Sequence, residues 1–376
     1  MTKPRILVTG ATGKTGSIVV ADLLRAGYPM RAMVHREDDR SEQLKAQGAE
    51  IAVAEIADVE RIAGALDDVQ RAYYCPPFEP YMVQGAAAFA VAARESRLEH
   101  IVSLTQWLSS PSHPALMTRQ HWLADRLFSM MPGISQTIVR PGFFAEVYLV
   151  TIRMAVNLGL FPWIYGESRN APPSNEDIAR VAVSALMDPA RHAGKSYRPT
   201  GPELLGAHDM ARAIGRAVGR SVRAVPTPTW MFMRAARMNG IPIDLMSGVR
   251  YYIDDHRRGA FELGAPTSDV LDVTGYPAEE FETIARRYAV LPRNQRTFGS
   301  RLRELAQFMM TPFSPGYDFE RYDRELRCPL PSEPQFAPES PIWRREHGIS
   351  DPGELAVSVY KDAAFHTGGA RWSESQ

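Results

Sequence analysis

The sequence has few lysines and no excess of either charge. Its 376 residues include 43 basic and 43 acidic side chains, so the composition gives no reason to expect binding to nucleic acid or to an anionic membrane surface. Lysine occurs at only five positions, Lys3, Lys14, Lys45, Lys195 and Lys361. Most of the basic residues are therefore arginines, which stay protonated near neutral pH and cannot act as general bases.

Cysteine clusters and long apolar runs are also missing. Cys75 and Cys328 have no spacing typical of a disulfide framework or a metal site. The run Asp254, Asp255, His256 gives no ligand set, because adjacent side chains on a helix point apart. No run of about 18 apolar residues is present, and the chain starts with an expected strand rather than a signal peptide. We therefore expect a cytoplasmic protein that binds no metal and no membrane.

One glycine-rich segment carries the strongest signal. A short apolar stretch, residues 4–9, is followed by Gly-Ala-Thr-Gly-Lys-Thr-Gly at 10–16 and then by an amphipathic helical pattern. In such a turn the first glycine permits the tight bend, the second lets the backbone approach a pyrophosphate, and the third lets helix and strand pack closely. The N–H groups and the dipole at the start of the helix favour the anion. The segment predicts a dinucleotide site formed by Gly10, Ala11, Thr12, Gly13, Lys14, Thr15 and Gly16.

Strand and helix patterns alternate after this segment. Expected strands lie at residues 30–34, 50–55, 71–75, 100–105 and 136–140, with helical patterns between them. This alternation requires a parallel sheet that is covered by helices on both faces. The predicted fold class is therefore α/β, with a doubly wound parallel Rossmann sheet.

Three regions follow from the same patterns. Residues 1–145 form the expected NAD(P)-binding domain, to which a strand near 195–200 returns. Residues 146–290 form a smaller, mixed and mainly helical substrate region. Regular patterns fade in the C-terminal extension, residues 291–376. We expect this extension to be partly extended or disordered, because residues 328–341 include five prolines.

The ends of the expected strands indicate the coenzyme. After the second strand, where a carboxylate would bind the ribose 2′-hydroxyl of NAD, the chain has Arg36, whose planar guanidinium suits a 2′-phosphate. Acidic residues follow at 37–39, so an ordinary surface arginine remains the alternative. We expect NADP(H) in preference to NAD(H). Further coenzyme contacts are expected at the ends of the third and fourth strands, from Glu55 and Ile56 and from Cys75, Pro76 and Pro77.

Two motifs resemble a known family. Segment 9–16 and the Arg-Pro-Gly-Phe-Phe segment at 140–144 resemble the NmrA-like branch of the atypical short-chain dehydrogenases. Segments 197–203 and 265–270 look like later landmarks of the same group, so the resemblance covers about residues 4–290. It implies a nicotinamide that lies near the end of the fifth strand and near Pro141, Gly142 and Phe143.

The resemblance also indicates where catalytic residues should lie. Thr105 falls where related enzymes have a catalytic serine, but the usual Tyr-x-x-x-Lys pair is absent. The lysine that some relatives keep falls within residues 119–121, where Gln120 is expected to contact the coenzyme and His121 could titrate near pH 7. His121 and Thr105 are the candidate catalytic residues. Asp125, one helical turn after His121, could orient its imidazole, and packing of His121 against the sheet is the alternative.

These patterns favour an NADP(H)-dependent oxidoreductase that acts on a small carbonyl, enone or quinone-like molecule. Two alternatives remain open, because fold does not decide function. One is a catalytically weak, NAD(P)-sensing regulatory protein, which the missing tyrosine–lysine pair favours and whose long C-terminal tail could bind a protein partner. The other is an NAD(P)-dependent isomerase or epimerase.

Overall fold

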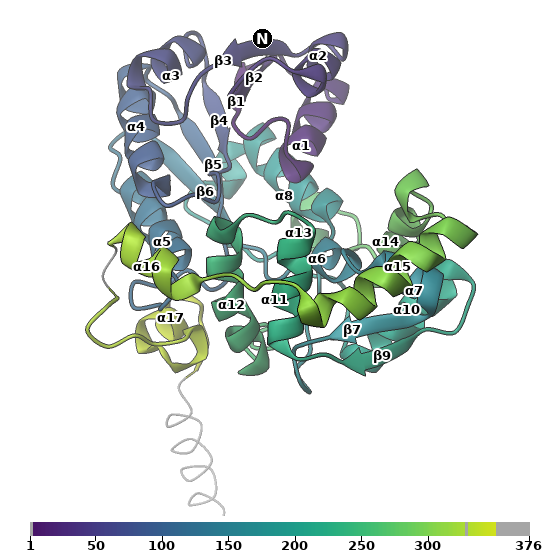
Figure 1. Ribbon diagram of the computed structural model, residues 1–376. Coiled ribbons are helices and arrows are strands. Elements are labelled where there is room, and N and C mark those ends of the chain that lie inside the picture. The colour runs from purple at the N-terminus through teal and green to yellow at the C-terminus, as the bar shows by residue number, and fades with distance from the viewer. Residues whose placement is uncertain (1–2, 328–329, 351–376) are drawn as a thin grey trace, which may run out of the picture.

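The computed structural model describes residues 3–327 and 330–350, and its main feature is a seven-stranded parallel sheet (Figure 1). Every neighbouring pair of strands is parallel. The strand order reverses between β1 and β4, and ligands of such sheets bind beyond the carboxyl ends of the strands at this switch point. Across the sheet, the strands are β3 (Glu50–Val53), β2 (Met30–Val34), β1 (Ile6–Val8), β4 (Arg71–Tyr74), β5 (His100–Leu104), β6 (Ser135–Val139) and β8 (Ser196–Tyr197). The predicted doubly wound sheet and its returning strand are confirmed.

Helices cover both faces of this sheet because its strands are apolar on both sides. Ile6 and Val8 face one side and Leu7 faces the other, as the two-residue period of a strand requires. The first side is covered by α1 (Lys14–Arg25), α8 (Asn175–Met187) and α13 (Asp269–Thr274). The second side is covered by α3 (Val59–Ala65), α4 (Met82–Glu95) and α5 (Leu116–Ser129). Helix α2 (Asp39–Ala46) lies beside β3, and α9 (Pro189–His192) lies beside β6.

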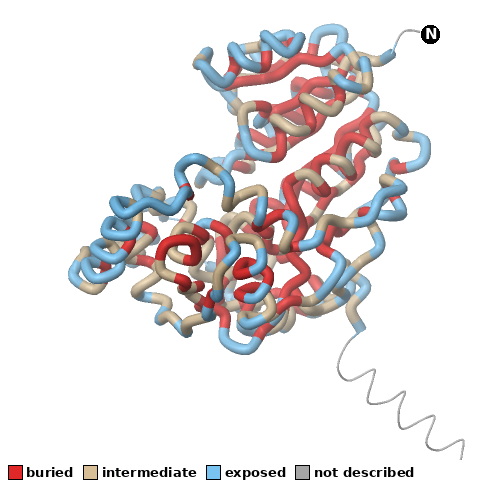
Figure 2. The backbone as a smooth tube through the Cα atoms, turned by 90° about the vertical axis from the view of Figure 1, so that its right-hand side faces the viewer, coloured by how far each residue is buried: buried red, intermediate tan, exposed pale blue. Residues whose placement is uncertain are grey.

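A second region, rich in aromatic side chains, lies below the carboxyl ends of the strands in Figure 1. Its own small sheet pairs β7 (Leu160–Trp163) with β9 (Arg223–Pro226) in parallel. The remaining helices of this region are α6 (Ala145–Leu149), α7 (Ile152–Leu158), α10 (Ala207–Val218), α11 (Thr229–Met238), α12 (Ile243–Arg257) and α14 (Phe281–Ala289). Figure 2 shows buried backbone in both regions. The region is mainly helical, as predicted.

The C-terminal extension is more helical than its sequence pattern indicated. It contains α15 (Phe298–Met310), α16 (Phe319–Leu326) and α17 (Pro341–Glu346). The expectation of a partly extended or disordered extension did not include these helices. The side chains of Thr297, Asp318 and Ser340 cap the three helices. Pro341 occupies the first turn of α17, where a proline does not interrupt the helix.

Residues 351–376, the end of the tail that could bind a protein partner under the regulatory alternative, lie outside the described residues. Within the described ranges, no helix is both long enough and apolar enough to cross a bilayer.

Candidate functional site

The glycine loop between β1 and α1 has the close backbone contacts that the motif predicts. Gly10 has a φ of +59°, in the left-handed region that favours glycine. A Cβ atom at Gly16 would lie 2.2 Å from the carbonyl oxygen of Gly10, so no larger residue fits there. Gly13 is the N-cap of α1 and provides no capping side chain. The first N–H groups of α1 thus lie at an uncapped helix start, which suits a diphosphate.

The polar residues of the loop hold the start of α1 against the second region. The Lys14 ammonium pairs with the Glu146 carboxylate of α6. The Thr15 hydroxyl lies 3.3 Å from Oδ1 of Asn175, and Asn175 Nδ2 donates to Glu146 Oε2 at 2.8 Å. The hydroxyl of Tyr288 donates to the same carboxylate oxygen, also at 2.8 Å. The loop is therefore fixed by contacts that reach three other helices.

Arg36, at the end of β2, has an exposed side chain and no ion pair among the described residues. The nearby Asp38 forms an ion pair with Arg40 instead, in which Arg40 Nη2 lies 2.7 Å from Asp38 Oδ2. His35 Nδ1 lies 2.6 Å from Oε1 of Glu55, so these two side chains also satisfy each other. The guanidinium of Arg36 therefore has no ion-pair partner among the described residues.

The end of β4 closes the other side of the glycine loop. The N–H of Cys75 donates to the hydroxyl of Thr9 at 2.8 Å, and a Cβ at Gly10 would lie 3.3 Å from Cys75 Cβ. Burial raises the pKa of the Cys75 thiol to about 11, so it is not a nucleophile at neutral pH. In the loop after β3, Ile56 packs against Gly85 of α4. The structure thus brings the ends of β1 and β4 together as predicted.

Thr105, at the end of β5, donates its hydroxyl hydrogen to Oδ2 of Asp125 at 3.1 Å. Both residues are buried. Burial raises the pKa of Asp125 to about 7, although Arg140 and Arg126 act in the opposite direction. The expectation that Asp125 orients His121 is not met, because among the described residues this carboxylate contacts Thr105.

His121 lies on the same face of α5 but is in an apolar environment. Burial lowers the pKa of its imidazole to about 3, so the expectation that it titrates near pH 7 is wrong. Its ring lies 6.0 Å from that of Phe78, edge to face. Within the described ranges Nε2 of His121 is buried without a hydrogen-bond partner. A neutral His121 can still contact a ligand, but it cannot act as a general acid at neutral pH.

Gln120 is placed at a small cavity near the end of β4. Its Nε2 donates to the carbonyl of Pro80. Its Oε1 is buried and has no partner within the described part of the chain. The cavity is about 20 Å³ in volume and is bordered by the loop after β4, the first turn of α5, α12 and α16. A buried amide oxygen without a partner is costly, and a ligand with an N–H or O–H group would satisfy it.

The loop after β6 is held from both sides. Trp107 N–H donates to the carbonyl of Pro141 at 3.0 Å, and Asn170 Nδ2 donates to the carbonyl of Phe143 at 2.7 Å. Gly142 lies against the ring of Phe261, where a Cβ atom would approach to 3.3 Å. The three residues predicted to lie beside the nicotinamide therefore form a rigid wall.

A buried hydrogen-bonded chain behind this wall was not predicted from the sequence. The hydroxyl of Ser168 donates to the carbonyl of Tyr165 at 2.9 Å, so it accepts from Nδ1 of His256, 2.5 Å away. Nε2 of His256 then accepts from the hydroxyl of Tyr148 at 2.6 Å. Burial lowers the pKa of His256 to about 3 and raises that of Tyr148, so both groups are neutral. Asn170 Nδ2 also donates to the Tyr148 hydroxyl at 3.1 Å, which completes a structural network.

The C-terminal extension forms part of the site's surroundings, which the sequence did not indicate. Trp343 of α17 is fully buried, and its indole N–H donates to the carbonyl of Trp107 at 2.7 Å. His347 Nε2 lies 3.1 Å from Nη1 of Arg140, at the end of β6. Asp255, next to His256, accepts from the N–H of Ala337 at 3.0 Å. The extension therefore packs directly behind the ends of β5 and β6.

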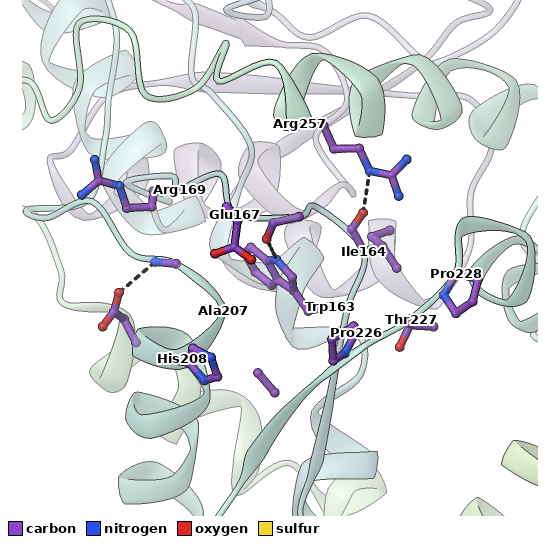
Figure 3. Close-up of a pocket in the computed structure, with 14 residues that line it drawn as sticks. Trp163, Ile164, Glu167, Arg169, Ala207, His208, Pro226, Thr227, Pro228 and Arg257 are labelled. Atoms are coloured by element: carbon purple, nitrogen blue, oxygen red, sulfur yellow. Dashed lines mark hydrogen bonds between the residues drawn. The ribbon is translucent and has the colours of Figure 1, made fainter.

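A larger cavity, of about 700 Å³, lies elsewhere in the second region (Figure 3). Trp163 lines it, together with charged side chains such as Glu167, Arg169 and Arg257. The ring of Trp163 stacks on Tyr148 at 5.9 Å, and Tyr148 packs against Phe143 at 5.3 Å. The rings of Trp163 and Tyr148 thus connect the wall of this cavity to Phe143 in the loop after β6. No cluster of His, Cys, Asp and Glu side chains in the described residues could hold a metal.

The known proteins that this chain resembles include two reductases and a transcriptional regulator. A model of the NmrA-like family matches residues 2–122. NAD(P)H azoreductase of Xenophilus azovorans is 32% identical over 291 residues, which cover 76% of this chain and 98% of that protein. The Escherichia coli NADPH-dependent quinone oxidoreductase QOR2, solved with NADPH, has a TM-score of 0.65 and 22% identity over 75% of this chain and 99% of that one. Nmra, a negative transcriptional regulator solved with NAD, has a TM-score of 0.62 and 16% identity, with coverage of 76% and 95%.

Proposed function

The chain belongs to the NmrA-like family, and on that premise we propose that it is an NADP(H)-dependent oxidoreductase that reduces a small carbonyl, enone or quinone-like molecule. The observation that carries the proposal is the glycine loop, in which Gly16 leaves no space for a Cβ and the start of α1 is uncapped. The azoreductase of Xenophilus azovorans, which uses NAD(P)H according to its name, supports the reaction class.

The residues around the carboxyl ends of the strands fit a bound NADP(H). Residues 10–16 bind the diphosphate, and Arg36 binds the 2′-phosphate through its guanidinium, which has no ion pair in the described part of the chain. Glu55 and Ile56 border the adenine, and residues 75–77 border the central part of the coenzyme. Gln120 and the loop after β6 contact the nicotinamide side. When bound, the reduced nicotinamide supplies the hydride, and the protein must position the acceptor and provide a proton.

The Thr105–Asp125 pair provides that proton in our proposal. With a pKa of about 7, the Asp125 carboxyl is partly protonated at neutral pH. Once protonated it can donate to Thr105 Oγ1, which frees the threonine hydrogen for the oxygen of the acceptor. Each reduction then consumes one hydride and one proton, and Asp125 is reprotonated afterwards. His121 remains a predicted contact of the ligand through its buried Nε2.

Steady-state consumption of NADPH tests this function directly. We expect turnover with at least one member of a panel of quinones, enones and aldehydes. Absence of turnover with every acceptor, in a preparation that binds NADPH, would overturn the proposed reaction.

A nucleotide-sensing regulatory protein is the second candidate. The fold is similar to that of Nmra, named as a negative transcriptional regulator, and Thr105 and His121 are both buried. This candidate predicts nucleotide binding without turnover, and different affinities for the oxidised and reduced forms. The acceptor panel therefore separates the two candidates.

A further inference from the structure

We propose that α16 is a lid over the acceptor site and that Tyr322 and Leu326, on its inner face, determine which acceptors enter. This inference rests on the proposed oxidoreductase function. It assigns a role to the C-terminal extension, of which α16 is the segment that lies over the small cavity beside Gln120.

The cavity lies where an acceptor should meet the coenzyme. It is bordered by Phe78 and Pro80 from the loop after β4, and by Met117 and Gln120 from α5. These elements carry the residues predicted to contact the coenzyme. Gln120 lines this cavity, and its buried Oε1 has no hydrogen-bond donor among the described residues.

Helix α16 supplies the outer wall of this cavity. Tyr322 and Leu326 are four residues apart, so they lie on one face of the helix, and both line the cavity. The remaining wall comes from α12, where Gly248 packs so closely on Met117 that a Cβ would lie 2.6 Å from the methionine methyl group. With α16 in place the cavity holds only about 20 Å³, which is too small for a quinone. An acceptor therefore requires α16 to move.

The polar contacts that hold α16 on α12 are partly exposed, and Phe319 at the start of α16 also packs against the apolar core of the second region. The hydroxyl of Tyr322 donates to Oδ1 of Asp244 at 2.6 Å. Nη2 of Arg250 lies 2.7 Å from Oδ2 of Asp323, and its guanidinium lies 4.8 Å from the ring centre of Phe319. Exposed ion pairs of this kind stabilise little. These polar contacts can break while Phe319 keeps the start of α16 against the core.

The helix itself is also suited to movement. It has eight residues and none of them is buried. A helix of this length is marginal in isolation, so its order depends on the contacts with α12. QOR2 is covered almost completely by 75% of this chain, so about a quarter of the chain has no counterpart there. The lid thus gives this chain a means of selecting acceptors that depends on the extension.

Two substitutions test the lid, and one serves as a control. Asp323→Asn breaks the contact with Arg250, and Leu326→Ala widens the cavity. Glu325→Gln changes the outer face of α16, where Glu325 pairs only with Arg321 among the described residues. All three positions lie on a helix without buried residues, so each variant should fold.

The first readout does not depend on activity. Oxidation of Met117 by hydrogen peroxide is located by peptide mass mapping. Because Met117 is already partly exposed, each variant's oxidation rate is compared with that of the wild type, and an increase reports further opening of the cavity. Asp323→Asn should speed this oxidation about threefold, the effect of losing one weak ion pair, whereas Glu325→Gln should leave it unchanged. An unchanged rate in Asp323→Asn overturns the lid, even if the wild-type protein binds no NADPH and the proposed function fails.

The second readout is the ratio of kcat/KM for 9,10-phenanthrenequinone to that for 1,4-benzoquinone. Leu326→Ala should raise this ratio about tenfold, as expected for a change of a few carbon atoms in an apolar pocket. The Kd for NADPH should stay the same, because Leu326 is not among the coenzyme contacts. An unchanged ratio contradicts the role of Leu326 in specificity.

Discussion

The hydroxyl of Thr105 lies 3.1 Å from Oδ2 of Asp125, and both residues are buried at the end of β5. Burial raises the pKa of this carboxyl to about 7. Arg140 at the end of β6 and Arg126 on α5 lower it, while Glu346 of α17 raises it. The pair can therefore hold and release a proton within the physiological range, although neither residue belongs to a tyrosine–lysine motif.

Reduction should depend on the protonated form of Asp125. We expect kcat/KM to be constant below about pH 6 and to fall with rising pH above about 7, because the proton is lost there. Asp125→Asn should lower kcat/KM by about 100-fold and remove this pH dependence. Asp58→Asn, at the N-cap of α3, is the control and should keep the wild-type profile. A wild-type profile in Asp125→Asn would show that the proton comes from another group.

The same carboxyl should affect stability. Its pKa is about 7 in the folded protein, against 3.8 for the free group, so the folded state binds the proton more tightly. The stability that this proton confers is present in full below about pH 4 and is lost as the pH rises to about 7. The variant Asp125→Asn has no carboxyl proton to lose at this position, so its stability does not fall for this reason over that pH range. Its stability relative to wild type should therefore increase between about pH 4 and pH 7 and level off near 4 kcal/mol at most. Urea unfolding at several pH values measures the difference, and a pH-independent difference would contradict the raised pKa.

Arg36 should select between the two coenzymes. Arg36→Gln should weaken binding of NADPH about tenfold or more, because it removes a charged hydrogen-bond donor from the 2′-phosphate. Binding of NADH should hardly change. Arg40→Gln is the matched control, since its guanidinium is already paired with Asp38. Equal effects of the two substitutions would place the 2′-phosphate elsewhere.

Gly16 should be sensitive to the smallest substitution. Gly16→Ala places a methyl group 2.2 Å from the carbonyl oxygen of Gly10, so it should distort the loop and abolish coenzyme binding. Gly64→Ala in α3 is the control, because a Cβ there meets no atom within 4 Å. We expect it to stabilise the protein by about 0.5–1 kcal/mol. Calorimetry and thermal unfolding check both variants, and unimpaired binding by Gly16→Ala would contradict the assigned loop geometry.

Local patterns were enough to predict the architecture. The apolar runs of β1, β2 and β5, and the glycines between β1 and α1, determine a buried parallel sheet from short segments of sequence. The family resemblance and the fold class are confirmed. The assigned coenzyme and catalytic residues remain predictions, although the structure does bring Gly10 and Cys75 together.

Contacts between distant segments could not be predicted. Tyr148 and His256 are 108 positions apart in sequence, and Trp107 and Trp343 are 236 apart. No local pattern indicates such pairs, because they depend on how whole elements pack. The same reason explains the error on His121. Its pKa is lower than that of free histidine because neighbouring elements bury the imidazole. Helices α16 and α17 of the extension were missed because they are short, with eight and six residues, and begin at capping residues.

Isothermal titration calorimetry of the full chain with NADPH and NADH tests the central claim most directly. We expect one NADPH to bind per chain, more tightly than NADH. At about 1 mM nucleotide even a weak site with a Kd near 1 mM is about half occupied. If neither nucleotide gives a heat of binding at that concentration, the coenzyme site and every step built on it are contradicted.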